Sequence, residues 1–403
     1  MDGELADMIY IGKAYIEKNG DVTSLCSDII FSGRTLKMYF EYDNEYSDYI
    51  CTDYADPFVL MILEYAMACG LDIKCEQSMS DTLYYNLTCH FIPILAENTR
   101  TFHRVNIFAE VSPIMRYTGG GVGAGLSCGI DSFNVINRYK NYSIEKYRLT
   151  HLFFMNNGQM GPIDYRETKD IFLIEKVHCM KAAEEIGLPL VCVNTNMMEL
   201  YGEIAAHRAN NAEGLKIASA VYGLRGMIKI YYIASTVGLD RFHFSDSDVG
   251  FFAPFTANIM SSESCCFLIG DLDNSKRICK EAYISDDPVM KQFLRINTIK
   301  NNPKSLKGIR TLSGFYVLGK LENLSQVMNL DNYCKRKAYY FGRNLCDRKE
   351  WDFGYNQEII SKAIENKMFC FLILSFMYRF IFWMPALFMK KIFCSVKRIL
   401  SRN

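Results

Sequence analysis

Between residues 113 and 300, short apolar segments alternate with longer amphipathic ones, and this alternation constrains the fold more than any other feature of the chain. The segments Val122–Leu126, Leu149–Met155 and Leu188–Val193 have the length and apolar character of buried strands. Strands that alternate with helices predict an α/β fold with a Rossmann-like parallel sheet and helices on both faces. Ligands of such sheets bind beyond the carboxyl ends of the strands.

The other elements expected in this region follow the same alternation. Helices are predicted at Ser132–Tyr139, at Asp164–Ile186 with Gly187 closing it, and at Gly214–Val237 with Gly238 closing it. A further strand is predicted at Arg241–Phe244.

Four regions are expected along the chain. Residues 1–112 form a mixed α+β N-terminal region, with a strand at Thr35–Tyr42 and an apolar helix that begins at Asp56-Pro57 and ends before Gly70. Residues 113–300 form the α/β domain that binds a ligand, residues 301–366 are helical, and residues 367–403 form an apolar and basic helix.

Charge and cysteine usage limit the partners and the compartment. Lys and Arg together number 45, as do Asp and Glu, so the chain has no excess positive charge for binding nucleic acid. Its 15 cysteines include no C-x-x-C pair, and the N-terminus Met1-Asp2-Gly3-Glu4 is unlike a secretory signal. These features predict a reducing, cytoplasmic location.

The segment Thr118–Ser132 reads TGGGVGAGLSCGIDS and carries the main functional prediction. A glycine-rich turn from a strand into a helix lets the backbone approach a pyrophosphate, and the first helical N–H groups can bind the anion. Ser127 and Ser132 add hydroxyl donors, and Asp131 is placed to hold Mg²⁺ that bridges phosphate oxygens.

The glycine-rich segment lacks the patterns of two other nucleotide-binding loops. A P-loop is excluded because no lysine follows these glycines in the G-x-x-x-x-G-K-[ST] pattern, and the dinucleotide-binding fingerprint fits the spacing poorly. The remaining alternative is an ordinary flexible turn in which Asp131 or Ser132 is the N-cap of the helix.

The hexapeptide Ser127-Cys-Gly-Ile-Asp-Ser132 resembles the S-G-G-x-D-S motif of the PP-loop ATP pyrophosphatases. Within that superfamily the chain is most similar to a bacterial branch akin to 7-cyano-7-deazaguanine synthase that is found with surface-polysaccharide genes. The resemblance covers about residues 35–340. Its supporting segments are Asp56-Pro-Phe58, Leu83-Tyr-Tyr-Asn-Leu87, Ser261-Ser-Glu263, Ile309-Arg-Thr-Leu312 and Leu318-Gly-Lys-Leu321.

The resemblance implies that ATP is cleaved to AMP and pyrophosphate. A substrate oxygen attacks the α-phosphorus, and an amine or sulfur nucleophile then displaces AMP, so an amide or a related C–N bond is the expected product. The phosphates are expected on the loop residues Ser127, Cys128, Gly129, Ile130, Asp131 and Ser132. Cys128 departs from the motif, because the family has glycine there.

Residues outside the loop add candidates for the same site. Arg277 and Lys280 are expected to neutralise the pyrophosphate, the alternative being a solvated helix face. Ser245 and Asp246 follow a predicted strand and are expected to contact the nucleotide or the acceptor, the alternative being a turn or a helix cap. His207 is a further candidate for the lining of the pocket.

The zinc site of the related enzymes is not expected here. Those enzymes have four cysteines, of which three lie in the pattern N-C-x-x-C-x-x-C-x-R-T-L. In this chain Asn302, Ser305 and Gly308 occupy the three cysteine positions, and Asn297 stands where the fourth would be. None of these residue types is a normal zinc ligand.

The segment Phe369–Met389 is the most apolar in the chain, with Arg379 as its one charge. About 20 apolar residues can span a bilayer, and a helix with basic anchors can also lie flat in the interface. A core or partner-facing helix is the third possibility. Basic residues follow the segment at Lys390, Lys391, Lys397, Arg398 and Arg402. The expectation is attachment to the inner face of the cytoplasmic membrane.

The sequence as a whole predicts a membrane-associated, ATP-dependent adenylating enzyme, with a substrate in surface-glycan or modified-base synthesis. The alternative is a non-catalytic nucleotide-binding scaffold at the membrane, which Cys128 and the lost cysteines favour. The neutral charge and the missing C-x-x-C argue against tRNA thiolation, and Asp2 stands where a glutaminase domain would expose a cysteine.

Overall fold

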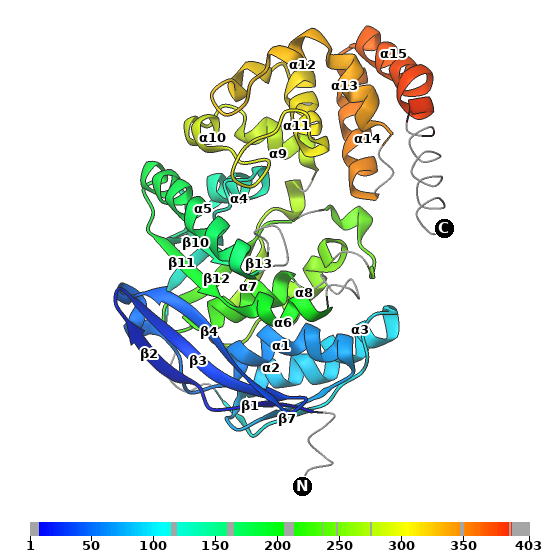
Figure 1. Cartoon of the computed structure of the whole chain (residues 1–403). Coiled ribbons are helices and arrows are strands. Elements are labelled where there is room, and N and C mark those ends of the chain that lie inside the picture. Colours follow the sequence, from blue (N-terminus) through cyan, green and yellow to red (C-terminus); the bar gives the residue numbers. More distant parts are fainter. Residues whose placement is uncertain are drawn as a thin grey trace. The chain divides into compact units, whose positions relative to one another are not determined.

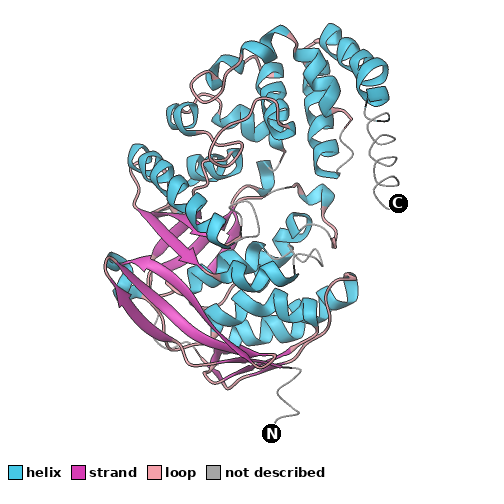
Figure 2. Ribbon diagram, viewed as in Figure 1, coloured by secondary structure: helices cyan, strands magenta, loops and turns pink. Residues whose placement is uncertain are grey.

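The computed structural model describes residues 8–113, 119–158, 165–204, 213–235, 237–246, 249–274, 276–346, 350–386 and 388. The chain forms two compact units, Met1–Ser275 and Lys276–Asn403 (Figure 1). The first unit combines a large sheet with helices, and the second is helical (Figure 2). The expected boundary at residue 300 lies inside the second unit.

The sheet of the first unit is mixed, with most of its neighbouring strands parallel. Its order is β13-β12-β9-β10-β11-β4-β3-β1-β5-β7, and β2 pairs with β3. The strands are β1 Met8–Ile11, β2 Tyr15–Asn19, β3 Val22–Phe31, β4 Arg34–Asp43, β5 Asp72–Cys75, β7 Ile107–Phe108, β9 Gly121–Gly125, β10 His151–Asn156, β11 Leu190–Thr195, β12 Ile228–Ile233 and β13 Cys266–Ile269. A separate two-stranded sheet pairs β6 Met79–Ser80 with β8 Val111–Ser112.

The strands from β9 to β13 are parallel and form the part of the sheet that positions the site. Counted from β9 as the first strand, their spatial order is 3-2-1-4-5. This is the order of doubly wound sheets, in which ligands bind where the strand order reverses. Here the reversal lies between β9 and β12.

Helices cover both faces of this parallel part. The connections between these strands place α4 and α5 on one face and α6 and α7 on the other (Figure 1). The long apolar helix α1 packs against α6 and α7 in the main core. The helices of the first unit are α1 Asp56–Cys69, α2 Asp81–Asn86, α3 Ile92–Asn98, α4 Ile130–Tyr139, α5 Tyr165–Ile186, α6 Met197–Ile204, α7 Glu213–Tyr222 and α8 Ala253–Ile259.

The N-terminal strands extend the same sheet in antiparallel fashion. A two-residue turn joins β3 to β4, with φ of +48° at Ser32 and +74° at Gly33. This backbone matches the twist of a tight hairpin. Strand β4 then pairs with β11 and connects the hairpin to the parallel part.

Most of the predicted elements of the α/β region are confirmed. The predicted strands 122–126, 149–155 and 188–193 correspond to β9, β10 and β11, and the predicted helices 132–139 and 164–186 correspond to α4 and α5. Gly187 ends α5 with a φ of +80°, as Gly70 ends α1 with a φ of +69°. A glycine in this left-handed conformation is the usual end of a helix.

The predicted helix Gly214–Val237 is wrong in its second half. The helix ends at Tyr222, and residues 228–233 form the strand β12. Gly223 follows the helix at a point where a side chain would collide with the Tyr42 hydroxyl, which donates to the carbonyl of Ala220. The apolar run of β12 lies inside the sheet between β9 and β13, and such buried strands lack the alternation that separates strand from helix.

The predicted strand Arg241–Phe244 is also wrong. Its place beside β12 is taken by β13, and residues 242–244 are irregular. The aromatic rings of this segment pack against one another and against a neighbouring segment. Phe242 contacts Phe244 with ring centroids 5.8 Å apart, and His243 contacts Phe251 at 4.4 Å.

The second unit is built from helices around a small apolar core. Its helices are α9 Arg277–Ile284, α10 Pro288–Phe293, α11 Leu306–Val317, α12 Asp331–Lys335, α13 Lys337–Asn344, α14 Glu350–Glu365 and α15 Phe369–Met377. A π-helical segment, Tyr378–Trp383, continues α15. The helical character predicted for residues 301–366 is confirmed over the part of that range that the structure describes.

Candidate functional site

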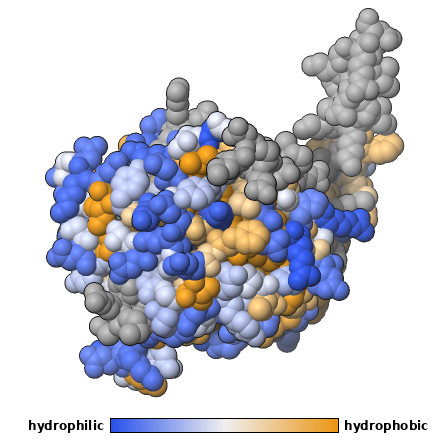
Figure 3. Space-filling model, turned by 90° about the horizontal axis from the view of Figure 1, so that it is seen from below, coloured by the Kyte–Doolittle hydropathy of each residue, from blue (hydrophilic) through white to orange (hydrophobic). Residues whose placement is uncertain are grey.

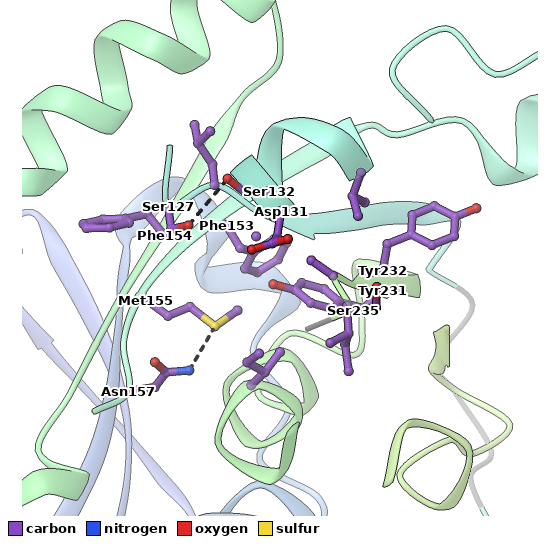
Figure 4. Close-up of a pocket in the computed structure, with 16 residues that line it drawn as sticks. Ser127, Asp131, Ser132, Phe153, Phe154, Met155, Asn157, Tyr231, Tyr232 and Ser235 are labelled. Atoms are coloured by element: carbon purple, nitrogen blue, oxygen red, sulfur yellow. Dashed lines mark hydrogen bonds between the residues drawn. The ribbon is translucent and has the colours of Figure 1, made fainter. Parts of the chain in front are cut away.

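A cavity of about 210 Å³ lies at the carboxyl ends of β9, β10 and β12. All of its walls belong to the first unit, and it opens where the strand order reverses. Figure 4 shows Ser127, Asp131 and Ser132 along one wall, with Asn157 and Tyr231 among the residues of the other walls. Sheets of this order bind their ligands at the same place.

The loop that forms the first wall runs from the end of β9 to the start of α4. Gly129 is the N-cap of α4, in an extended conformation, and it has no side chain that could accept hydrogen bonds from the first-turn amides. Asp131 and Ser132 lie inside the helix, so the interpretation of either as the N-cap is wrong. The Ser132 hydroxyl donates to the Gly129 carbonyl at 2.9 Å and lies 3.5 Å from the Ser127 hydroxyl.

Asp131 is the acidic residue of this wall. It lies in the first turn of α4, where the helix dipole stabilises a negative charge, and it lines the cavity beside two serine hydroxyls. Within the described ranges, no group of three or more His, Cys, Asp or Glu residues could hold a metal by itself. Mg²⁺ in nucleotide sites commonly takes one or two carboxylates and completes its shell with phosphate oxygens and water, and a single Asp131 fits that donor set.

The glycines before the loop were predicted to let the backbone approach the phosphates. In the structure they serve packing within the sheet. A Cβ at Gly121 would lie 2.8 Å from the carbonyl oxygen of Met227, and one at Gly123 would lie 2.9 Å from Phe153 and 3.0 Å from Tyr231. Strand β9 therefore needs glycine to fit between the large side chains of β10 and β12. The approach to a ligand is left to residues 127–132.

Cys128 has the backbone conformation that a glycine would adopt at this turn. Its φ is +54°, in the left-handed region that costs other residues about 1–2 kcal/mol. Its side chain is completely buried, with Sγ 3.9 Å from Sγ of Cys179. The hydrogen bond with Cys128, together with burial, raises the pKa of the Cys179 thiol. The thiol of Cys128 thus lies in the protein core and does not line the cavity.

Two further polar residues of the cavity were not predicted. Asn157 follows β10, is only 2% exposed, and its Oδ1 has no hydrogen-bond partner among the described residues. Ser235 follows β12, and its amide donates to Asp271 at 2.7 Å. The same carboxylate accepts from Asn134 of α4 at 2.8 Å, so it joins two walls of the cavity. A polar residue shortly after an apolar strand was the signal that could have found both.

Ser245, Asp246 and His207 were predicted for the same site. In the part of the chain that the structure describes, Ser245 and Asp246 are not among the residues lining the cavity. Ser245 is buried, and Asp246 accepts the amide of Arg100 at 2.6 Å. His207 lies outside the described residues.

Arg277 and Lys280 lie in α9, in the second unit. Arg277 pairs with Glu281 at 3.2 Å, and Lys280 is completely buried. The alternative of a solvated helix face is therefore wrong for Lys280. The role of both residues toward a pyrophosphate stays a prediction.

The four positions that match the zinc cysteines lie together and are joined by hydrogen bonds. Asn297 Oδ1 accepts from the amide of Asn302 at 3.1 Å and from the hydroxyl of Ser305 at 3.0 Å. Ser305 Oγ accepts the amide of Gly308 at 2.9 Å and is thereby the N-cap of α11. We name these four residues the Asn297 cluster; it joins the turn to the helix through hydrogen bonds alone.

Comparison with known proteins adds no relative. No protein-family model matches the chain, and neither a curated protein nor a solved structure matches it. The functional assignment therefore rests on the residues of the cavity and on the motif they form.

Proposed function

We propose that the first unit binds Mg-ATP, with its phosphates at the N-terminus of α4, and cleaves it to AMP and pyrophosphate. One observation carries this proposal: Ser127, Asp131 and Ser132 line a cavity at the N-terminus of α4, whose N-cap residue Gly129 has no side chain, at the point where the order of a parallel sheet reverses. Helix N-termini with free amides bind phosphate, and the residue types present suit an anion with its cation.

Each group of the loop has a role in this proposal. The first-turn amides of α4 and the hydroxyls of Ser127 and Ser132 donate hydrogen bonds to phosphate oxygens and orient them. Asp131 holds Mg²⁺, which when bound neutralises phosphate charge. A substrate oxygen forms a bond to the α-phosphorus while the bond to pyrophosphate breaks, and the protein contributes position and charge stabilisation.

Asn157 supports the presence of a ligand in the cavity. A buried carboxamide oxygen without a partner costs about 1–3 kcal/mol, and a hydrogen-bond donor entering the cavity would remove that cost. The cavity is smaller than the ~300–1,000 Å³ of pockets that enclose drug-sized ligands. It therefore suits one part of a nucleotide, while the remainder extends from its mouth.

The chemistry after ATP cleavage rests on the resemblance. It favours transfer of the activated group to an amine, forming an amide or a related C–N bond in surface-glycan or modified-base synthesis.

A second candidate function is a nucleotide-binding scaffold without turnover. Cys128 favours it, because a residue other than glycine in a left-handed conformation strains the loop that would have to follow the reacting phosphates.

The test is the binding of ATP to the full-length protein by calorimetry, with and without Mg²⁺, followed by assays for AMP and pyrophosphate with carboxylate and amine substrates. Asp131→Ala should weaken Mg-ATP binding about 10- to 100-fold, roughly the value of one charge-assisted contact. Asp240→Ala removes an exposed carboxylate and should leave binding unchanged.

Three results decide between the candidates. Turnover that Asp131→Ala abolishes supports the enzyme, whereas binding without AMP release under all substrates supports the scaffold. Failure of the wild-type protein to bind ATP would overturn both.

A further inference from the structure

The C-terminal helix has a continuous apolar face with no covering side chains among the described residues. The helical run Phe369–Ala386 is long and apolar enough to cross a membrane, and only 17% of it is buried. Ile373 is 60% exposed, Phe380 57% and Ile381 71%. A groove on this side is lined only by the apolar residues Leu372, Ile373, Phe376, Met377, Phe380 and Ile381. On the face shown in Figure 3, hydrophobic residues are interspersed with hydrophilic ones.

The opposite side of the same helix is firmly packed on α13. Trp383 Nε1 donates to the carbonyl of Tyr339 at 2.9 Å, and the Tyr339 ring lies 5.4 Å from that of Tyr378. A Cβ at Gly342 would lie 2.6 Å from the carbonyl oxygen of Ser375, so the absence of a side chain there lets the two helices approach closely. These contacts run from the middle of α15 through the π-helical segment.

Charge along the sequence identifies the class of partner. Residues 366–403 contain seven Lys and Arg residues and no Asp or Glu, although the whole chain has 45 basic and 45 acidic residues. The rest of the chain therefore has seven more acidic than basic residues. An apolar helix face followed by basic residues fits a bilayer with anionic headgroups, because the apolar side chains enter the interface and the cations bind the lipid phosphates.

We propose that this face is a membrane-binding surface and that the helix lies parallel to an anionic bilayer without crossing it. The packing on α13 decides the orientation. A run of 18 residues is about 27 Å long, close to the ~30 Å of the hydrocarbon core, so crossing would place its whole length in lipid. Crossing would therefore require the helix to separate from α13, or would require α13 to enter the hydrocarbon together with its charged residues Lys337 and Arg343. Lying flat keeps every one of these contacts.

The first experiment measures sedimentation of the full-length protein with vesicles of phosphatidylcholine, alone or with phosphatidylglycerol. We expect binding that increases with the anionic lipid and weakens with salt. The double variant Ile373→Glu/Ile381→Glu should bind at least about tenfold less, since carboxylates are disfavoured among lipid chains. The matched variant Ile174→Glu/Val177→Glu, on the exposed apolar side of α5, should bind like the wild type.

The second experiment measures depth. The chain has two tryptophans: Trp351 is replaced by phenylalanine, whereas Trp383, which bonds to Tyr339 of α13, is kept and its signal is subtracted as background. Ile373→Trp and Ile381→Trp are then introduced singly and quenched by lipids brominated at shallow or deep positions. The two sites are eight residues, or about 12 Å, apart along the helix axis. A flat helix gives the same shallow depth for both.

Three results would overturn the proposal. Depths that differ by about 10 Å would mean that the helix crosses the bilayer. A wild-type protein that does not sediment with anionic vesicles would show that this face does not bind the membrane. A dimer that buries this face would show that it binds protein instead.

Discussion

The loop Ser127–Ser132 and the Asn297 cluster both gather polar groups at the start of a helix, but they use them differently. In the cluster, Asn297, Asn302, Ser305 and Gly308 bond to one another, and Ser305 caps α11. At the loop, the helix begins at Gly129 without a side-chain cap, and Ser127, Asp131 and Ser132 line a cavity, although the two serine hydroxyls also bond within the loop. Polar groups that satisfy one another stabilise the fold, whereas groups facing a cavity reduce stability and remain available to a ligand.

The largest expected effect concerns Glu281, a buried carboxyl group of the second unit that lies outside both of these regions. Burial raises the pKa of Glu281 to about 7 from its ordinary 4.5, against the opposing effect of Arg277. The folded chain therefore holds this proton more tightly than the unfolded chain, and the stability it contributes is complete below pH 4.5 and lost as the pH rises through 7. The expected loss is about 3 kcal/mol.

Urea unfolding between pH 5 and pH 8 measures this effect. Glu281→Gln should flatten the pH profile by removing the titrating group, whereas Glu322→Gln, an exposed substitution in the same unit, should keep the slope. An unchanged slope in Glu281→Gln would show that this carboxyl is ionised throughout.

The next test is a substitution in the cavity that should raise the free energy of unfolding and weaken ATP binding. Asn157→Leu removes a buried oxygen that has no partner in the described part of the chain, so the free energy of unfolding should rise by about 1–2 kcal/mol while ATP binding weakens. Asn194→Leu is the matched control. Asn194 is also a buried asparagine near the carboxyl end of a strand, here β11, but its side chain is bonded to Asn156 and Glu41. It should destabilise the protein. Destabilisation by Asn157→Leu as well would remove the contrast between the two regions.

A smaller effect is expected at the Asn297 cluster. Ser305→Ala removes the cap of α11 and should lower the free energy of unfolding by about 1 kcal/mol, measured by thermal or urea unfolding, with ATP binding unaffected. Ser305→Asp, which keeps a capping oxygen, should restore most of the loss. A change in ATP binding in Ser305→Ala would contradict the purely stabilising role of this cluster.

The smallest effect is expected at Cys128. Cys128→Gly relieves a left-handed backbone but loses a buried thiol packed on Cys179, so the two changes should offset to within about 1 kcal/mol. Calorimetry should also show tighter ATP binding, because the loop becomes the glycine form of the motif. Weaker binding would show that the thiol shapes the loop.

The sequence predicted the parts of the fold that have a local cause. Strands β9 to β11 and helices α4 and α5 were found because apolar runs alternated with amphipathic ones and ended at glycines such as Gly187. The hairpin of β3 and β4 was missed in part, although Ser32-Gly33 is a recognisable two-residue turn. Strand β12 was mistaken for helix because its identity depends on neighbours far away in the sequence, Gly121 and Cys266 among them.

The candidate site divides in the same way. Ser127, Asp131 and Ser132 were recognised because they lie within one six-residue motif, and the structure places all three on the cavity. The structure adds Tyr231 in β12, Asn157 just after β10 and Ser235 just after β12, and only the sheet order brings them beside that loop. Ser245 followed a segment that is not a strand, which removed the reason for placing it at a strand end.

The carboxylate of Asp271 has a consequence for how the cavity receives a ligand. It bonds at once to the amide of Ser235 beyond β12 and to Asn134 in α4. These two bonds set the width of the cleft in the free protein. The walls of the cavity are therefore held at a fixed distance before a ligand enters. Little of the binding free energy is then needed to draw them together.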